Sequence, residues 1–127
     1  MNHQIAPPHI APPAAYYAHA VLSEASARLL HTAGVVPVRP DGTVPDEVGE
    51  QAAAVWENVG AILEAAGMEP ADIVSYTTYV VAGVSLAPVM AARDDFLRSH
   101  LAASTLVTVP ALARPEWRIE ITVVAAR

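Results

Sequence analysis

The feature that most constrains the fold of this chain is one apolar stripe between residues 48 and 66. Apolar residues recur there every three or four positions, the spacing of one helix face: Val48, Ala52, Val55, Val59, Ile62, Leu63 and Ala66. Thr43 can cap such a helix, Pro45 suits its first turn, and Gly67 can end it. The stripe predicts a helix of about 20 residues with one buried face.

Strand patterns lie on both sides of this helix. The predicted strands are residues 16–22, 28–38, 72–81, 104–109 and 117–125. A polar connection at 23–26 suggests that the first two strands form a hairpin. A second helix is expected from a cap at Ser85 to near His100. The order β-β-α-β-α-β-β predicts an α+β fold, with one sheet and two helices on one face.

The N-terminal segment differs from the rest of the chain in its proline content. Four prolines fall within residues 1–15: Pro7, Pro8, Pro12 and Pro13. This density disfavours a helix or a central strand. We therefore expect a Pro-rich arm over residues 1–15 and a single domain over residues 16–127.

Composition excludes several classes of function. The chain lacks cysteine and lysine, so thiolate and Schiff-base chemistry are excluded. Thirteen acidic residues against seven arginines give a net charge of −6, which disfavours nucleic-acid binding. No apolar run approaches the roughly 18 residues of a membrane span, and no targeting segment is apparent, so a cytoplasmic protein is expected.

Charged residues make up only 16% of the chain, whereas hydrophobic residues make up 54%. This balance leaves too little polar surface for a typical small monomer. It suggests that part of the apolar content lies in a subunit interface. An alanine-rich monomer is the alternative.

Several short segments together resemble the RidA/YjgF family in order and spacing. They are residues 31–37 (His-Thr-Ala-Gly-Val-Val-Pro), Asp41-Gly42, Gln51, Asn58, residues 63–67, residues 72–74, residues 104–107, Leu112 and Ile119-Glu120-Ile121. The resemblance implies a chorismate-mutase-like α+β subunit, assembled as a homotrimer around a barrel core with clefts between subunits. It also implies hydrolysis of reactive imines and enamines, such as 2-aminoacrylate, to ketoacids and ammonia without a metal or organic cofactor.

The same resemblance implies a catalytic centre. Tyr17 corresponds to a pocket tyrosine, and the backbone of Gly34 is expected to approach the substrate. Glu120 is expected to hold or activate the attacking water as a general base. Independently of the family, a glycine inside a strand, such as Gly34, suggests a bulge or a close backbone approach.

The substrate-binding positions match the family less well. Family deaminases carry an arginine that binds the substrate carboxylate, and the corresponding residue here is Ser104. Leu106 stands where a cysteine is common, and the loop that ends at Ser85 is one residue shorter than in the family. Ser104 and Thr105 can instead donate hydrogen bonds to a neutral or weakly anionic ligand.

Two arginines, Arg114 and Arg118, are candidates to replace the missing one; Arg118 shares a strand face with Glu120. The alternative is that both are ordinary surface residues. His19 and His31 stand alone, without metal-ligand spacing, so no metal site is expected.

The resulting prediction is an enzyme acting on an imine, enamine or related carbonyl intermediate at an intersubunit cleft, by water addition or proton transfer. A role in a specialised biosynthetic pathway fits this prediction. Classical 2-aminoacrylate deaminase activity is expected to be weak or absent because Ser104 replaces the arginine. The alternatives are a non-catalytic small-molecule-binding or regulatory trimer, and a chaperone-like or ribonuclease-like protein; the acidic charge disfavours a ribonuclease.

Overall fold

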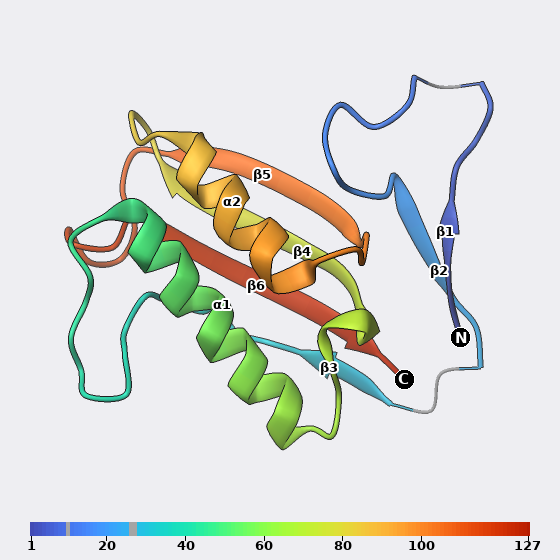
Figure 1. The fold of residues 1–127 in the computed structure, drawn as a ribbon, viewed down its shortest axis with the longest axis horizontal. Coiled ribbons are helices and arrows are strands. Elements are labelled where there is room, and N and C mark those ends of the chain that lie inside the picture. The colour runs from blue at the N-terminus through green and yellow to red at the C-terminus, as the bar shows by residue number, and fades with distance from the viewer. Residues whose placement is uncertain (10, 26–27) are drawn as a thin grey trace.

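The computed structural model describes residues 1–9, 11–25 and 28–127 (Figure 1). In chain order its elements are β1 (Asn2–Ile5), β2 (Ala20–Ser23), β3 (Leu29–His31), α1 (Val48–Ala65), a short 3-10 helix (Pro70–Asp72), β4 (Ile73–Val81), α2 (Leu86–Leu97), β5 (Ala103–Val109) and β6 (Ile119–Ala126). Within the described ranges, no helix has both the length and the apolar character that crossing a membrane requires.

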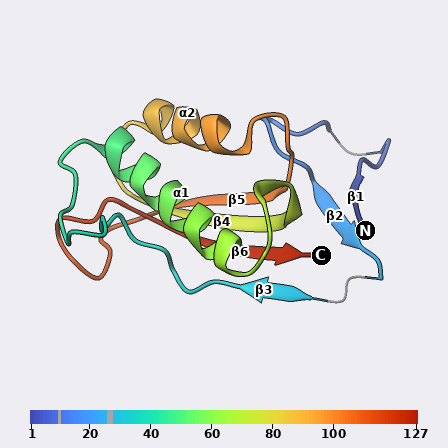
Figure 2. The same cartoon turned by 60° about the horizontal axis from the view of Figure 1, so that its bottom comes forward.

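The main sheet contains four strands in the order β3-β6-β4-β5. Strand β6 runs antiparallel to both β3 and β4, whereas β4 and β5 are parallel and are connected through α2. A parallel pair needs such a crossover connection, and a helix provides it. Figure 2 shows α1 and α2 on the same side of this sheet. The predicted α+β class, with two helices on one face, is confirmed.

The hydrophobic core lies between the helices and this sheet. The apolar stripe of α1 packs on alternate residues of β4 and β6, which point to the helix side. Trp56 is 2% exposed and anchors this layer. Its ring stacks on Phe96 of α2, with centroids 4.9 Å apart, and meets Tyr76 of β4 edge-on at 5.4 Å. Trp56 therefore joins both helices to the sheet.

The ends of α1 follow the prediction at one terminus only. At the C-terminus, Gly67 has φ of +68°, and the amide of Met68 donates to the carbonyl of Leu63, as in a Schellman cap. At the N-terminus, the cap position is Glu47 rather than Thr43. The Thr43 hydroxyl instead donates to Asp41 at 2.7 Å within the preceding turn, and this bond lowers the pKa of the Asp41 carboxyl.

A buried amide fixes α1 to the start of β6. Gln51 is 1% exposed, and its side chain donates to the carbonyls of Pro45 and Glu116, each at 2.8 Å. Its carbonyl oxygen accepts the amide of Arg118 at 2.9 Å. Asn58, two turns further along α1, donates to the carbonyls of Val36 and Val38. These two residues hold the segment between β3 and α1 and the segment before β6 in place.

The N-terminal strands depart from the prediction. Strand β2 pairs with β1, not with β3, so the expected hairpin between residues 16–22 and 28–38 is absent; part of its proposed connection lies outside the described residues. Strand β1 precedes the prolines, which fall in the loop between β1 and β2, where a missing amide proton breaks no ladder. This unit contacts the large sheet through a bridge between Ala18 and Ala103 and through the Asn2 side-chain amide, which donates to the carbonyl of Ala126 at 3.1 Å.

Replacing Gln51 by alanine is expected to lower the free energy of unfolding by about 3 kcal/mol, because three buried or part-buried hydrogen bonds to backbone groups would be lost. The measurement is chemical denaturation followed by circular dichroism. Glu57→Ala, an exposed change on the same helix, is the matched control and should change stability by less than about 0.5 kcal/mol. Equal stability of the two variants would show that Gln51 does not hold these segments.

Candidate functional site

The face of the main sheet away from the helices carries the candidate site. Strand alternation places every second residue of β4, β5 and β6 on this face, and their neighbours in sequence point to the core. Its central residues are Ser75, Thr77, Tyr79, Thr105, Val107, Glu120 and Thr122. In the part of the chain that the structure describes, no helix covers this face (Figure 2). We call it the open face.

Gly34 lies directly against Glu120 on this face. The neighbouring residues Val35 and Ile121 form a backbone bridge, with N–O distances of 2.7 and 3.0 Å. A Cβ added to Gly34 would lie 1.9 Å from Oε2 of Glu120 and 2.6 Å from its Cδ. An alanine at this position would force the flexible end of the Glu120 side chain to move. The predicted strand over residues 28–38 is shorter than expected, since β3 ends at His31 and Gly34 lies beyond it; the group that approaches Gly34 is the side chain of Glu120.

The Glu120 carboxylate has no polar partner among the described residues. Glu120 is half-buried and pairs across the ladder with Tyr79 of β4. Over residues 1–9, 11–25 and 28–127, no ion pair or side-chain hydrogen bond involves its carboxylate. Arg118 lies two residues away on the same face but is exposed, whereas Arg114 lies over the Trp117 ring in a loop, 5.6 Å from the ring centroid.

Strand β5 places the predicted substrate-binding residues on two different faces. Ser104 pairs with the buried Tyr76, and Leu106 pairs with the buried Thr78, so both point toward the helices. They line a small internal cavity there, on the opposite face of the sheet from Glu120. Thr105 pairs with Thr77 and is exposed on the open face. The structure therefore brings Thr105, and not Ser104 or Leu106, to the face of Glu120.

Tyr17 lies away from Glu120 within one chain. The chain meets the large sheet at Ala18, whose amide donates to the carbonyl of Ala102 at the start of β5. Strands β5 and β4 then separate this point from β6. The Tyr17 hydroxyl accepts the amide of Ala14 at 3.3 Å, and its ring meets His19 edge-on at 6.1 Å.

Other candidate residues also lie apart from Glu120. Ser85 is exposed at the N-cap position of α2, without a side-chain capping bond. His31 is exposed at the end of β3, and the His19 ring contacts the carbonyl of Ala11 at 2.8 Å. The described residues contain no group of three His, Asp or Glu side chains that could hold a metal ion.

Sequence reasoning missed Tyr79, which faces Glu120 across the ladder. Strand periodicity alone places Tyr79 on the same face as Thr77, but it does not determine which residue of β6 lies opposite. Only the pairing register supplies that neighbour.

Gly34→Ala is expected to destabilise the protein by no more than about 1 kcal/mol, because the Glu120 carboxylate, the flexible end of its side chain, must turn away from the new methyl group. The backbone of Gly34 has no positive φ, so alanine meets no conformational penalty there. In a Glu120→Ala background, the overlapping atoms are gone and the cost should fall below about 0.5 kcal/mol. Denaturation of the four proteins of this double-mutant cycle gives the coupling; additive effects would contradict the contact.

Comparison with known proteins identifies the family. The family model described as "Endoribonuclease L-PSP" matches residues 9–127. The 2-iminobutanoate/2-iminopropanoate deaminase of Escherichia coli K12 is 38% identical over 103 residues, which is 78% of this chain and 80% of the relative.

Solved structures agree with this match. A Rid-family protein of unknown function from Yersinia pestis, YyfB, has a TM-score of 0.87 at 32% identity, covering 99% of this chain and 98% of that one. E. coli TdcF with bound serine has a TM-score of 0.73 at 29% identity, covering 96% and 93%. The chain therefore belongs to the endoribonuclease L-PSP family, also called the RidA/YjgF family, whose relatives include reactive-intermediate deaminases.

Proposed function

We propose that this protein hydrolyses reactive imines or enamines on the open face, with Glu120 as the general base. The observation that carries this proposal is the carboxylate of Glu120 held against the backbone of Gly34, without a cationic partner among the described residues. A half-buried carboxylate in this position can hold a water molecule and take its proton. The deaminase names of the relatives support the reaction class.

The proposed reaction needs only water and the chain's own groups. Glu120 takes a proton from water as the oxygen attacks the imine carbon, forming a carbon–oxygen bond and a carbinolamine. The carboxylic acid then returns that proton to the nitrogen. As the carbon–nitrogen bond breaks, Glu120 takes the hydroxyl proton of the carbinolamine and passes it to the departing nitrogen, so that ammonia leaves and a carbonyl product remains. Tyr79 and Thr105 lie on the same face, where their hydroxyls can orient the substrate.

The substrate class follows from the absence of an arginine on β5. Neither Ser104 nor Thr105 can form the bidentate pair that an arginine makes with a carboxylate. The preferred substrates are therefore imines or enamines without a carboxylate next to the reacting carbon. An intermediate of a specialised biosynthetic pathway would fit this description.

We further propose that the site is completed in a homotrimer. The open face exposes apolar side chains, among them Val107 at 38% and Leu29 at 64%. Burying them against other copies of the chain is favourable and would cover the face. Because Tyr17 lies far from Glu120 within one chain, a neighbouring subunit is needed if both belong to one cleft.

Light scattering should then give about three times the chain mass of 13.3 kDa.

The wild-type protein should release ammonia faster than the uncatalysed reaction from an imine that lacks a carboxylate. An amine oxidase acting on propylamine generates a suitable probe in situ. 2-Iminobutanoate should be a poor substrate. Binding of the carbonyl product without any ammonia release would instead support a non-catalytic binding protein. If the wild type turns over 2-iminobutanoate efficiently and Arg118→Gln abolishes that activity, Arg118 is the residue that binds the substrate carboxylate.

Placing an arginine on β5 tests which residue faces the site. Thr105→Arg should raise kcat/KM for 2-iminobutanoate by about tenfold or more, because a bidentate pair at a closed site contributes on the order of 2 kcal/mol or more. Ser104→Arg is the matched control: it should give no gain and should destabilise the fold, since its side chain points into the core. A gain from Ser104→Arg alone would contradict the register of β5.

A further inference from the structure

We propose that the groove between α1 and α2, on the helix side of the sheet, binds a small organic cation: a protonated amine with a ring-sized apolar body and one oxygen acceptor. The groove has a volume of about 390 Å³, which is in the range of small-molecule sites. It is independent of Glu120, which lies on the other face of the sheet.

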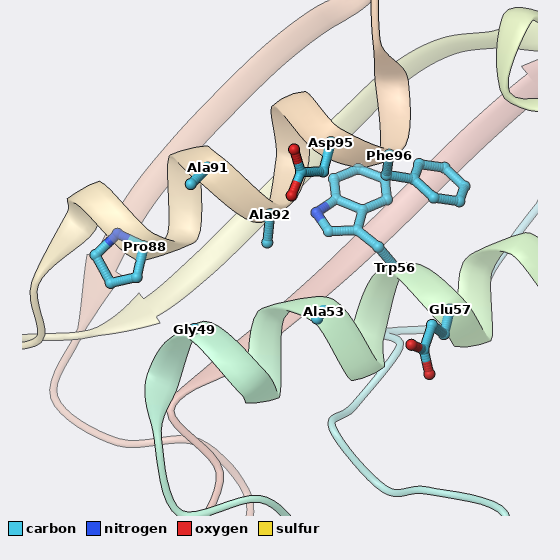
Figure 3. Close-up of a pocket in the computed structure, with 9 residues that line it drawn as sticks. All are labelled: Gly49, Ala53, Trp56, Glu57, Pro88, Ala91, Ala92, Asp95 and Phe96. Carbon is cyan, nitrogen blue, oxygen red and sulfur yellow. The ribbon is translucent and has the colours of Figure 1, made fainter.

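The groove is closed at both ends, which favours a small molecule over a peptide. At one end the helices nearly touch, since a Cβ on Gly49 would lie 3.1 Å from Cβ of Pro88. At the other end, Phe96 stacks on Trp56. Between them the walls are small side chains of Ala53, Ala91 and Ala92 (Figure 3). A continuous peptide would have to pass through these closed ends.

Trp56 provides an unused hydrogen-bond donor at this groove. Its indole Nε1 is buried and has no partner among the described residues, although a buried N–H group is normally paired. Figure 3 shows the nitrogen edge of the ring turned along the groove, beside Ala92 and Asp95. An oxygen acceptor on a bound molecule would satisfy this N–H. Purely apolar ligands would leave it unpaired.

The charge around the groove is negative. Asp95 of α2 and Glu57 of α1 line it, and among the described residues neither takes part in an ion pair. Figure 3 shows the Asp95 carboxylate close to the indole and Glu57 on the outer side of α1. Glu57 also lines a second hollow, which it shares with Arg39. Arg93 is buried and already pairs with Asp94 at 2.9 Å. Asp95 is therefore the carboxylate available to a bound cation.

These features define the ligand by its parts. The ammonium group pairs with Asp95, the oxygen accepts the Trp56 N–H, and the apolar body covers the alanine walls and the edge of Phe96. Each part matches one feature of the groove, and compounds that lack one part should bind more weakly. Tyramine carries all three parts, 2-phenylethylamine lacks the oxygen, and 4-ethylphenol lacks the ammonium group.

The test is titration of the ¹⁵N-labelled full chain with these three probes, followed through the two tryptophan indole N–H resonances. Trp117→Phe assigns them, because the chain has only two tryptophans. Tyramine should move the Trp56 indole proton downfield in a saturable way at millimolar concentrations and leave that of Trp117 in place. 2-Phenylethylamine should perturb the groove without this downfield shift, and 4-ethylphenol should need a higher concentration.

Asp95→Asn should weaken tyramine binding roughly three- to fivefold, as expected for a solvent-accessible ion pair. Glu64→Gln, an exposed change on α1 outside the groove, should leave the affinity unchanged. If tyramine does not move the Trp56 resonance, the proposal is wrong. The indole N–H would then face the internal cavity beneath it and not the groove. An affinity insensitive to Asp95→Asn would also overturn the proposal. Both outcomes leave the proposed reaction at Glu120 unaffected.

Discussion

Both helices pack on the same face of the four-stranded sheet, and the positions of the functional groups depend on this asymmetry. One set of alternating residues in β4, β5 and β6 is buried under Trp56 and the apolar stripe of α1. The other set faces away from the helices and can be polar or reactive. Gln51 fixes this arrangement because its buried amide ties the start of β6 to α1. The register of β6 in turn brings Glu120 over Gly34.

The two faces of the sheet change which residue of β5 should be compared with the carboxylate-binding arginine of the family. On β5, the residue that shares the face of Glu120 is Thr105, whereas Ser104 is part of the layer beneath the helices. Neither residue can hold a carboxylate as an arginine does, so the inference of a carboxylate-free substrate does not depend on which of the two is compared with the family. The two faces also separate the two proposed functions: chemistry at Glu120, and binding in the groove between the helices.

Hydrophobic periodicity and helix-capping residues were sufficient to predict the helices and strands whose sequences carry strong local patterns. The stripe of α1, its end at Gly67 and the strands β4 to β6 were predicted within a few residues. Pairing between distant segments could not be predicted. Strand β2 pairs with β1, which lies before the prolines and keeps its backbone N–H groups for hydrogen bonding. No local sequence pattern encodes that pairing. Gly34 was recognised from the sequence as a place of close approach, but neither the end of β3 at His31 nor Glu120 as the approaching group was predicted. Strand alternation alone places Ser104 and Thr105 on opposite faces, but the register was needed to show that Thr105 shares the face of Glu120.

The central claim is that the Glu120 carboxylate takes the proton of the attacking water. The most direct measurement is kcat for ammonia release from a carboxylate-free imine by the wild type and by Glu120→Gln, which keeps the shape of the side chain and removes its basicity. The account predicts a fall in kcat of about a hundredfold or more, the usual contribution of a positioned general base, with an unchanged oligomeric mass. An unchanged kcat in a correctly assembled variant would contradict it.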